Sequence, residues 1–163
     1  MNSPIHVLVL CTGNSARSIL GEMLFRHLGQ GRVAAYSAGS KPGGMVNPVA
    51  LETLQRHDIP CEGARSKSWD EFAAPGAPGL DFIFTGCANA ASEPCPVWPG
   101  HPTTAHWALP DPAHVEPLTA RREAFEKAYQ SLHRRISAFL ALPLESMAPE
   151  AIVAAARRIH DQT

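Results

Sequence analysis

The sequence lacks both a long hydrophobic run and a block of like charge. Its longest apolar stretch near the N-terminus, Val7 to Leu10, is too short for the core of a signal peptide or for a membrane-spanning helix. The 14 basic and 15 acidic residues give a net charge of -1, and without a charged tail the chain shows no feature typical of nucleic-acid or membrane-surface binding. We therefore expect a cytoplasmic protein whose partners include neither nucleic acid nor membrane.

Metal-ligand patterns are also missing. No CxxC pair and no HxxxH pair occurs, and Cys87, Cys95, His101 and His106 follow an uneven order unlike that of structural zinc sites. A chain of 163 residues with 45% hydrophobic residues can bury a core without disulfides or metals. We expect one domain over residues 1–163 with no metal and no cofactor, in which some of the four cysteines do chemical or redox work.

The first half of the chain alternates strand and helix patterns. Residues 6–10 (HVLVL) form a continuous apolar run typical of a strand buried on both faces. Apolar residues at helical spacing follow over residues 20–28, and a second strand is predicted over residues 33–37. Asn47 as N-cap and Pro48 at the first helical position then predict a second helix.

The second half continues this alternation. The patterns predict a helical turn at residues 69–72, strands at 80–85 and 104–109, a long helix from about 119 to 142, and a last helix at about 149–160 on the rim of the domain. Residues 86–102 contain four prolines and two cysteines, so they are predicted to form a long functional loop. The order of elements predicts an α/β fold, a three-layer sandwich with a four-stranded parallel sheet flanked by helices.

The candidate reactive loop lies between the first strand and the first helix. Open parallel sheets place their ligands at this position, where backbone N–H groups and a helix N-terminus bind anions. Arg17 can grip two oxygens of a tetrahedral oxyanion with its guanidinium group. The predicted oxyanion-binding residues after Cys11 are Thr12, Gly13, Asn14, Ser15, Ala16, Arg17 and Ser18.

Cys11 is the predicted nucleophile of this loop. The helix N-terminus and Arg17 favour a thiolate, so the pKa of Cys11 should lie well below the ordinary value of about 8.5. Ser18 can donate a hydrogen bond to the thiolate, and Asn14 can hold the loop in a partly left-handed course, where Gly13 relieves steric strain. The alternative is a cysteine that only packs after a strand; a nucleotide-binding loop is disfavoured because no GK[ST] ending is present.

Several segments resemble a known family. CTGNSARS, starting at Cys11, together with the pair Asp111-Pro112, resembles the low-molecular-weight tyrosine phosphatase fold. RSKSWDEF at 65–72, CPVWPG at 95–100 and HWALPDP at 106–112 resemble the arsenate reductases built on that fold. The resemblance extends through about residue 142.

The resemblance implies a thiol relay. Cys11 would attack arsenate, Arg17 and the loop amides would bind its oxygens, and Asp111 would protonate the leaving group. Cys87 would then attack Cys11 and expel arsenite, and Cys95 would take over the disulfide for reduction by thioredoxin or by glutaredoxin with glutathione. Phosphate and sulfate would compete with arsenate as anions.

The thiols on the long loop also have a structural alternative. Cys87 and Cys95 are eight residues apart on a Pro-rich segment, so loop motion can bring them to disulfide distance; the alternative is that Cys87 ends a strand and Cys95 packs beneath the loop. Cys61 matches no thiol of the family and is expected to be structural. His106 and His114 flank Asp111, but neither is assigned a catalytic role.

One departure from the family concerns a cation. Some relatives bind potassium beside the anion loop through Asn, Glu, Ser and Asp, of which Asn14, Glu22 and Ser37 match the first three. Lys67 stands at the fourth position, so we expect its ammonium to replace the ion. The alternative is a solvated lysine. A further departure is Ala16, where the family often has a cysteine.

Two other functions compete with arsenate reduction. A tyrosine phosphatase would use the same Cys11, Arg17 and Asp111, but phosphatases of this fold usually have an aromatic residue just after the Asp-Pro pair, where Ala113 and His114 stand here. A non-catalytic module would bind an oxyanion or sense oxidation without turnover. Retention of Asp111 argues against that function.

Overall fold

A four-stranded parallel sheet forms the centre of the molecule. The computed structural model describes residues 4–11, 13–72, 76, 79–85, 103–107, 109–110 and 112–162. All neighbouring strands pair in parallel, in the order β2-β1-β3-β4. The strands are β1 (Ile5–Cys11), β2 (Val33–Gly39), β3 (Phe82–Thr85) and β4 (Thr103–His106). The predicted fold class is confirmed.

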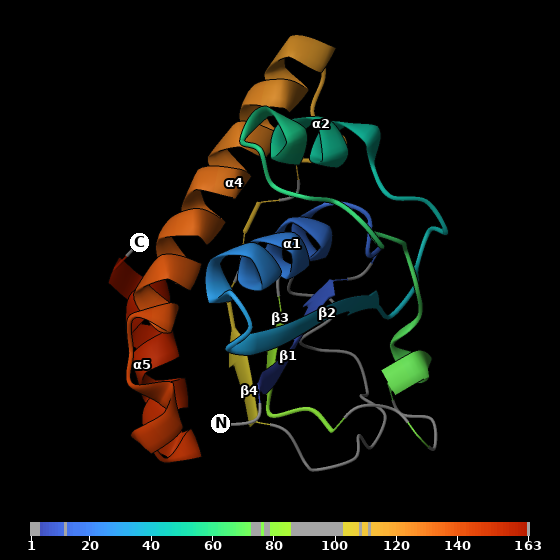
Figure 1. The fold of residues 1–163 in the computed structure, drawn as a ribbon. Coiled ribbons are helices and arrows are strands. Elements are labelled where there is room, and N and C mark those ends of the chain that lie inside the picture. Colours follow the sequence, from blue (N-terminus) through green and yellow to red (C-terminus); the bar gives the residue numbers. More distant parts are fainter. Residues whose placement is uncertain are drawn as a thin grey trace.

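Helices flank this sheet, and the longer ones among the described residues belong mainly to the core on one face. They are α1 (Arg17–Gly29), α2 (Pro48–Arg56), α4 (Leu118–Leu140) and α5 (Pro149–Gln162), with short 3-10 helices η1 (Trp69–Phe72) and η2 (Leu144–Ser146). Helix α1 packs on β1 and β2, and the long α4 runs beside both α1 and α2 (Figure 1). Helix η1 lies beyond β2, away from α4 (Figure 1).

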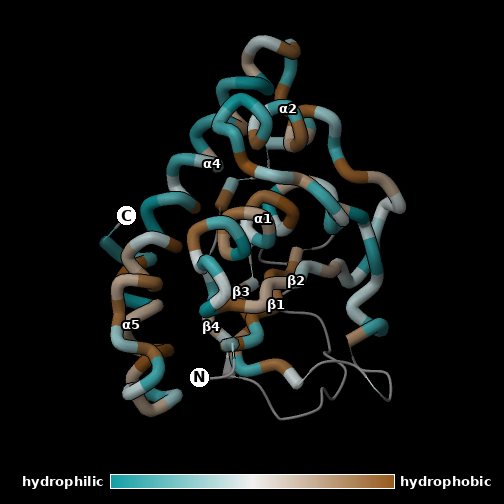
Figure 2. The backbone as a smooth tube through the Cα atoms, viewed as in Figure 1, coloured by the Kyte–Doolittle hydropathy of each residue, from teal (hydrophilic) through white to brown (hydrophobic). Residues whose placement is uncertain are grey.

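The sheet is buried on both faces, as the continuous apolar run of β1 predicts. Val7 and Val9 belong to the core that includes α1 and α4, whereas Leu8 and Leu10 pack with Trp69 and neighbouring apolar residues on the opposite face. Figure 2 shows hydrophobic colour along the central strands and mixed colour along α4, whose outer side meets water. Burial of both faces fixes the direction in which the strand ends, and therefore where Cys11 emerges.

Two strands are shorter than the sequence suggests. β3 begins at Phe82 because Asp81 ends the ladder: its side chain accepts the His6 N–H at 2.8 Å while its own N–H bonds the His6 carbonyl at 2.8 Å. β4 stops at His106 because β3 ends at Thr85, whose carbonyl accepts the Trp107 N–H at 2.9 Å. Trp107, predicted as a strand residue, keeps this one hydrogen bond to β3 but lies beyond the paired part of the strand.

The last helix closes the open edge of the sheet. Helix α5 packs against β4 and α4, and it buries Ile152, Val153 and Ala156 in the main core. The indole Nε1 of Trp107 donates to the carbonyl of Ala156 at 2.9 Å. Since β4 is an edge strand, this helix shields an edge that would otherwise be open to pairing with other chains.

A search of the described helices for membrane-spanning segments found none that is long and apolar enough to cross a bilayer.

The contact between α1 and β1 leads to a stability prediction. A Cβ added at Gly21 would lie 3.0 Å from Cγ1 of Val9, and Val9 is a buried β-branched residue with little freedom to turn. We expect Gly21→Ala to lower the free energy of unfolding by about 1 kcal/mol, because overpacking outweighs the gain in helix propensity. Denaturant unfolding measures this change.

Gly79→Ala is the control, since its added Cβ meets no atom within 4 Å. A Gly21→Ala protein more stable than the wild type would show that the helix and strand separate easily, contrary to this account.

Candidate active site

The candidate site begins where β1 ends and α1 starts. Cys11 is the last residue of β1 and is 4% exposed, and Arg17 opens α1. The residue before the helix is Ala16, whose methyl side chain cannot cap the first N–H groups. The positive end of the helix dipole therefore lies at this end of the sheet, where it favours negative charge.

Asn14 holds the loop of residues 11–18, called here the nucleophile loop. Its backbone has a φ of 47°, as the predicted left-handed course requires, and its side chain is fully buried. The amide Nδ2 donates to Ser18 Oγ at 2.8 Å and to Ser37 Oγ at 3.0 Å, while Oδ1 accepts the Lys67 N–H at 2.8 Å. The side-chain amide of Asn14 thus joins the loop to α1, to β2 and to the segment before η1.

Ser18 lies in a position that suits its predicted role. It is fully buried, and its oxygen accepts a hydrogen bond from Asn14. The hydroxyl hydrogen of Ser18 is therefore not used in that bond. Donation of this hydrogen to the Cys11 thiolate stays a prediction.

The carbonyl groups of the nucleophile loop turn outward toward residues 40–47, called here the rim loop. The Gly13 carbonyl accepts the Gly43 N–H at 3.1 Å, and the Ser15 carbonyl accepts the Asn47 N–H at 2.9 Å. The Cys11 carbonyl accepts the N–H of Ser40 at 3.3 Å. A loop whose carbonyl groups bond outward can direct its N–H groups inward, which is the arrangement of an anion nest.

Arg17 connects this loop to the segment after β4. Its Nη1 donates to the carbonyl of Leu109 at 3.0 Å. A guanidinium group has five N–H donors in a planar fork, so this contact helps to orient the group. Leu109 precedes Asp111 by two residues.

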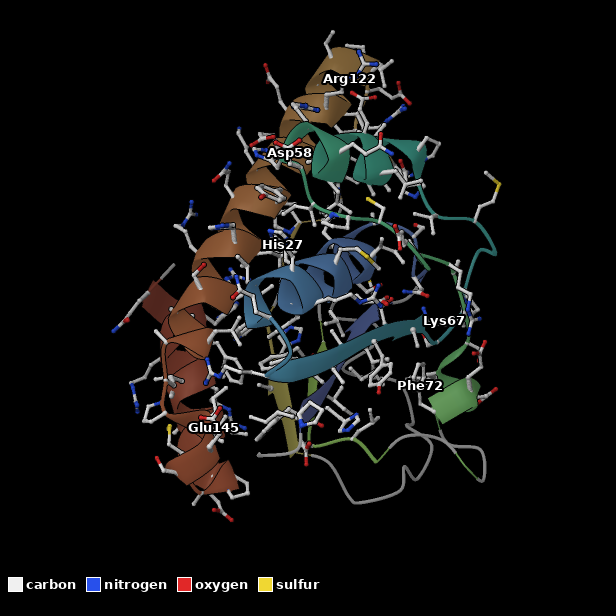
Figure 3. All side chains as sticks on the ribbon, viewed as in Figure 1. His27, Asp58, Lys67, Phe72, Arg122 and Glu145 are labelled. Atoms are coloured by element: carbon white, nitrogen blue, oxygen red, sulfur yellow. The ribbon has the colours of Figure 1, made fainter. Side chains whose placement is uncertain are left out.

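Lys67 lies at the carboxyl end of β2 (Figure 3). Its side chain is 6% exposed, and Nζ is 3.7 Å from Oε1 of Glu22 and 3.4 Å from Oγ of Ser37. Nζ also donates to the Arg65 carbonyl at 3.0 Å. The alternative of a solvated lysine is therefore wrong.

The charges around Lys67 are partly balanced. Burial lowers the pKa of Lys67, and the nearby Glu22 carboxylate opposes that shift. Glu22 is 3% exposed, accepts the Ser37 hydroxyl hydrogen and pairs with Arg26 at 2.8 Å. Nζ has one carboxylate and two oxygen acceptors around it, and these partners favour its charged form.

Some predicted site residues cannot be placed. Thr12, Cys87, Cys95 and Asp111 lie outside the described residues. Their assigned roles therefore stay predictions.

Cys61 and the two histidines have ordinary surroundings. Cys61 is half-buried, its Sγ donates to the Ile59 carbonyl at 3.4 Å, and burial raises the pKa of its thiol, which suits a structural cysteine. His106 shares a 2.7 Å hydrogen bond between Nδ1 and Thr85 Oγ1, and His114 is exposed. Among the described residues, no group of three or more His, Cys, Asp or Glu residues could hold a metal ion.

The fold and the candidate site define a class of protein: a parallel α/β domain with a cysteine at the end of its first strand and an arginine at the start of the helix that follows. The chain belongs to the low molecular weight phosphotyrosine protein phosphatase family, whose model matches residues 6–151.

Comparison with individual proteins narrows this class. An arsenate reductase of Shouchella clausii is 31% identical over 134 residues, which are 82% of this chain and 93% of the relative. A solved arsenate reductase in the phosphate binding state has a TM-score of 0.67 at 24% identity, over 84% of this chain and 97% of that chain. A thioredoxin-dependent arsenate reductase of Corynebacterium glutamicum has a TM-score of 0.56 at 23% identity, over 84% of this chain and 64% of that chain.

The position of Lys67 predicts that the site works without potassium. Since Nζ lies beside Glu22 and Ser37, the rate of the expected arsenate reduction should be equal in potassium chloride and sodium chloride at the same ionic strength. A severalfold higher rate in potassium would refute this. Lys67→Asp, which replaces the ammonium by a carboxylate, should make turnover respond to potassium and serves as the positive control.

Proposed function

We propose that this protein reduces arsenate to arsenite, with Cys11 as the nucleophile. The observation that supports this most strongly is the placement of Cys11 and Arg17 at opposite ends of the nucleophile loop, at the start of α1. The loop suits a tetrahedral oxyanion because the helix N-terminus and the guanidinium group both attract negative charge. The 31% identity to an arsenate reductase favours arsenate as the substrate among the tetrahedral oxyanions.

In the first step, the Cys11 thiolate attacks arsenic. A sulfur–arsenic bond forms and an arsenic–oxygen bond breaks, and Asp111 protonates the departing hydroxide so that it leaves as water. Arg17 and the loop N–H groups stabilise the charge on the remaining oxygens. The hydrogen bond from Arg17 to the Leu109 carbonyl at 3.0 Å supports this division of labour, since Leu109 precedes Asp111 by only two residues in the sequence.

In the second step, arsenic is reduced. The Cys87 thiolate attacks Sγ of Cys11, the sulfur–arsenic bond breaks, and its electron pair stays with arsenic, which leaves as arsenite. A Cys11–Cys87 disulfide remains. Cys95 then attacks Cys87, which releases the Cys11 thiolate and leaves a Cys87–Cys95 disulfide.

An external dithiol has to return two electrons to the Cys87–Cys95 disulfide. We favour thioredoxin, because a disulfide within the protein is a substrate for a dithiol carrier and because a relative of this fold is named thioredoxin-dependent. Glutaredoxin with glutathione is the other donor. Both donor systems keep thiols reduced in the cytoplasm, so the cytoplasm is the proposed compartment.

Tyrosine phosphatase activity is the alternative function. The family model supports it, and Cys11 and Arg17 would serve it equally well. The turn after Pro112 argues against it, because Ala113 and the exposed His114 stand where phosphatases of this fold have a large aromatic side chain to flank a phosphotyrosine. A module that binds oxyanions without turnover would retain anion binding and lose both activities.

The test is arsenate-dependent NADPH oxidation by the reduced protein, measured with thioredoxin and its reductase and, in parallel, with glutaredoxin, glutathione and glutathione reductase. We expect turnover with thioredoxin, its loss in Cys11→Ser and Cys87→Ser, and its retention in Cys61→Ser. Cys61→Ser is the matched control because it removes a thiol outside the site. No turnover with either donor, together with brisk hydrolysis of p-nitrophenyl phosphate, would establish the phosphatase instead.

A further inference from the structure

Ser66 joins two loops at the active site. Its Oγ accepts the Gly44 N–H of the rim loop at 3.2 Å and donates to the carbonyl of Gly13 at 3.2 Å. The next residue, Lys67, holds Asn14 through its backbone N–H. Ser66 thus bonds to the carbonyl of the peptide that links Gly13 and Asn14, and Lys67 bonds to the side chain of Asn14.

The direction of that peptide matters for anion binding. In a trans peptide the C=O and N–H groups point in opposite directions. The Gly13 carbonyl points outward, toward the Ser66 hydroxyl and the Gly43 N–H, so the N–H of Asn14 points to the opposite, inner side of the loop. An N–H group held in this direction is a preorganised donor for an oxyanion.

The hydrogen bond to Ser66 also holds the rim loop at Gly44. Gly44 has a φ of 85°, and its N–H bonds to the side chain of Ser66. Gly43 adds the second hydrogen bond on the Gly13 carbonyl. Without the Ser66 hydroxyl, the Gly13 carbonyl keeps one of its two outward bonds and the rim loop loses one attachment.

We propose that Ser66 is a positioning residue of the oxyanion site: its hydroxyl fixes the Gly13–Asn14 peptide so that the Asn14 N–H binds the tetrahedral anion. This inference deepens the proposed function and depends on Cys11 lying under a bound oxyanion. It predicts that the hydroxyl of residue 66 affects anion affinity and Cys11 reactivity more than it affects folding.

The experiment uses inorganic phosphate as the probe. Phosphate protection of Cys11 against iodoacetamide, followed peptide by peptide so that other thiols do not interfere, gives the phosphate dissociation constant. Ser66→Ala should raise this constant about fivefold, since one net hydrogen bond contributes about 1 kcal/mol. Its Cys11 should also need a higher pH for rapid alkylation, because the loop dipoles are less well aligned.

Matched variants separate positioning from packing. Ser66→Thr keeps the hydroxyl and should stay near the wild type, whereas Ser66→Val has the shape of threonine without the hydroxyl and should behave like Ser66→Ala. If Ser66→Ala folds poorly, the comparison of the Thr and Val variants still shows whether the hydroxyl group affects phosphate binding. Ser146→Ala removes a hydroxyl that bonds only locally, to the Pro143 carbonyl at 3.0 Å, and should change neither quantity.

Equal phosphate affinity and equal alkylation profiles for the Val and Thr variants would overturn the proposal. The test is independent of arsenate turnover. A wild type that binds phosphate but reduces no arsenate would remove the proposed function and leave the role of Ser66 intact, whereas arsenate reduction with phosphate binding unchanged in Ser66→Val would remove only the role of Ser66.

Discussion

The active site depends on the buried side chain of Asn14. A non-glycine residue in the left-handed region costs roughly 1 kcal/mol, and Asn14 adopts that conformation inside the protein. Its side-chain amide donates to Ser18 and Ser37 and accepts from the Lys67 backbone N–H, and these three hydrogen bonds offset the cost. Because those partners come from α1, β2 and the segment before η1, the nucleophile loop keeps its shape only when the surrounding fold is complete.

The same partners lead to the buried charges. Ser37 joins Asn14 to Glu22 and Lys67, so a single hydroxyl group separates the carboxylate and the Lys67 amine from the amide that shapes the loop. Removing one member of a buried charge pair leaves the other without compensation. The arrangement of these charges therefore affects the shape of the nucleophile loop, although neither Glu22 nor Lys67 is proposed to touch the substrate.

Much of this architecture could be predicted from the sequence. The continuous apolar run before Cys11 predicted the buried first strand, and the helical spacing that follows predicted the first helix. The binding of an anion by the loop between them stays a prediction. The left-handed Asn14 was also predicted, since asparagine tolerates that conformation better than most residues.

Long-range contacts could not be predicted in this way. The strand ends at Phe82 and His106 depend on where the neighbouring strand stops, which a local pattern does not contain. Burial of Lys67 depends on Glu22 and Ser37, far away in the sequence. The role of Ser66 rests on hydrogen bonds across 53 and 22 residues, and nothing in its local sequence signals them.

The central claim is that electrons reach arsenic from the cysteines of this chain. The most direct measurement is a single turnover of the fully reduced protein with arsenate in the absence of any external thiol, followed by assay of arsenite and mapping of disulfides by mass spectrometry. The account predicts arsenite in an amount equal to that of the protein, together with a disulfide between Cys87 and Cys95. Unchanged arsenate with all four cysteines still reduced would contradict it.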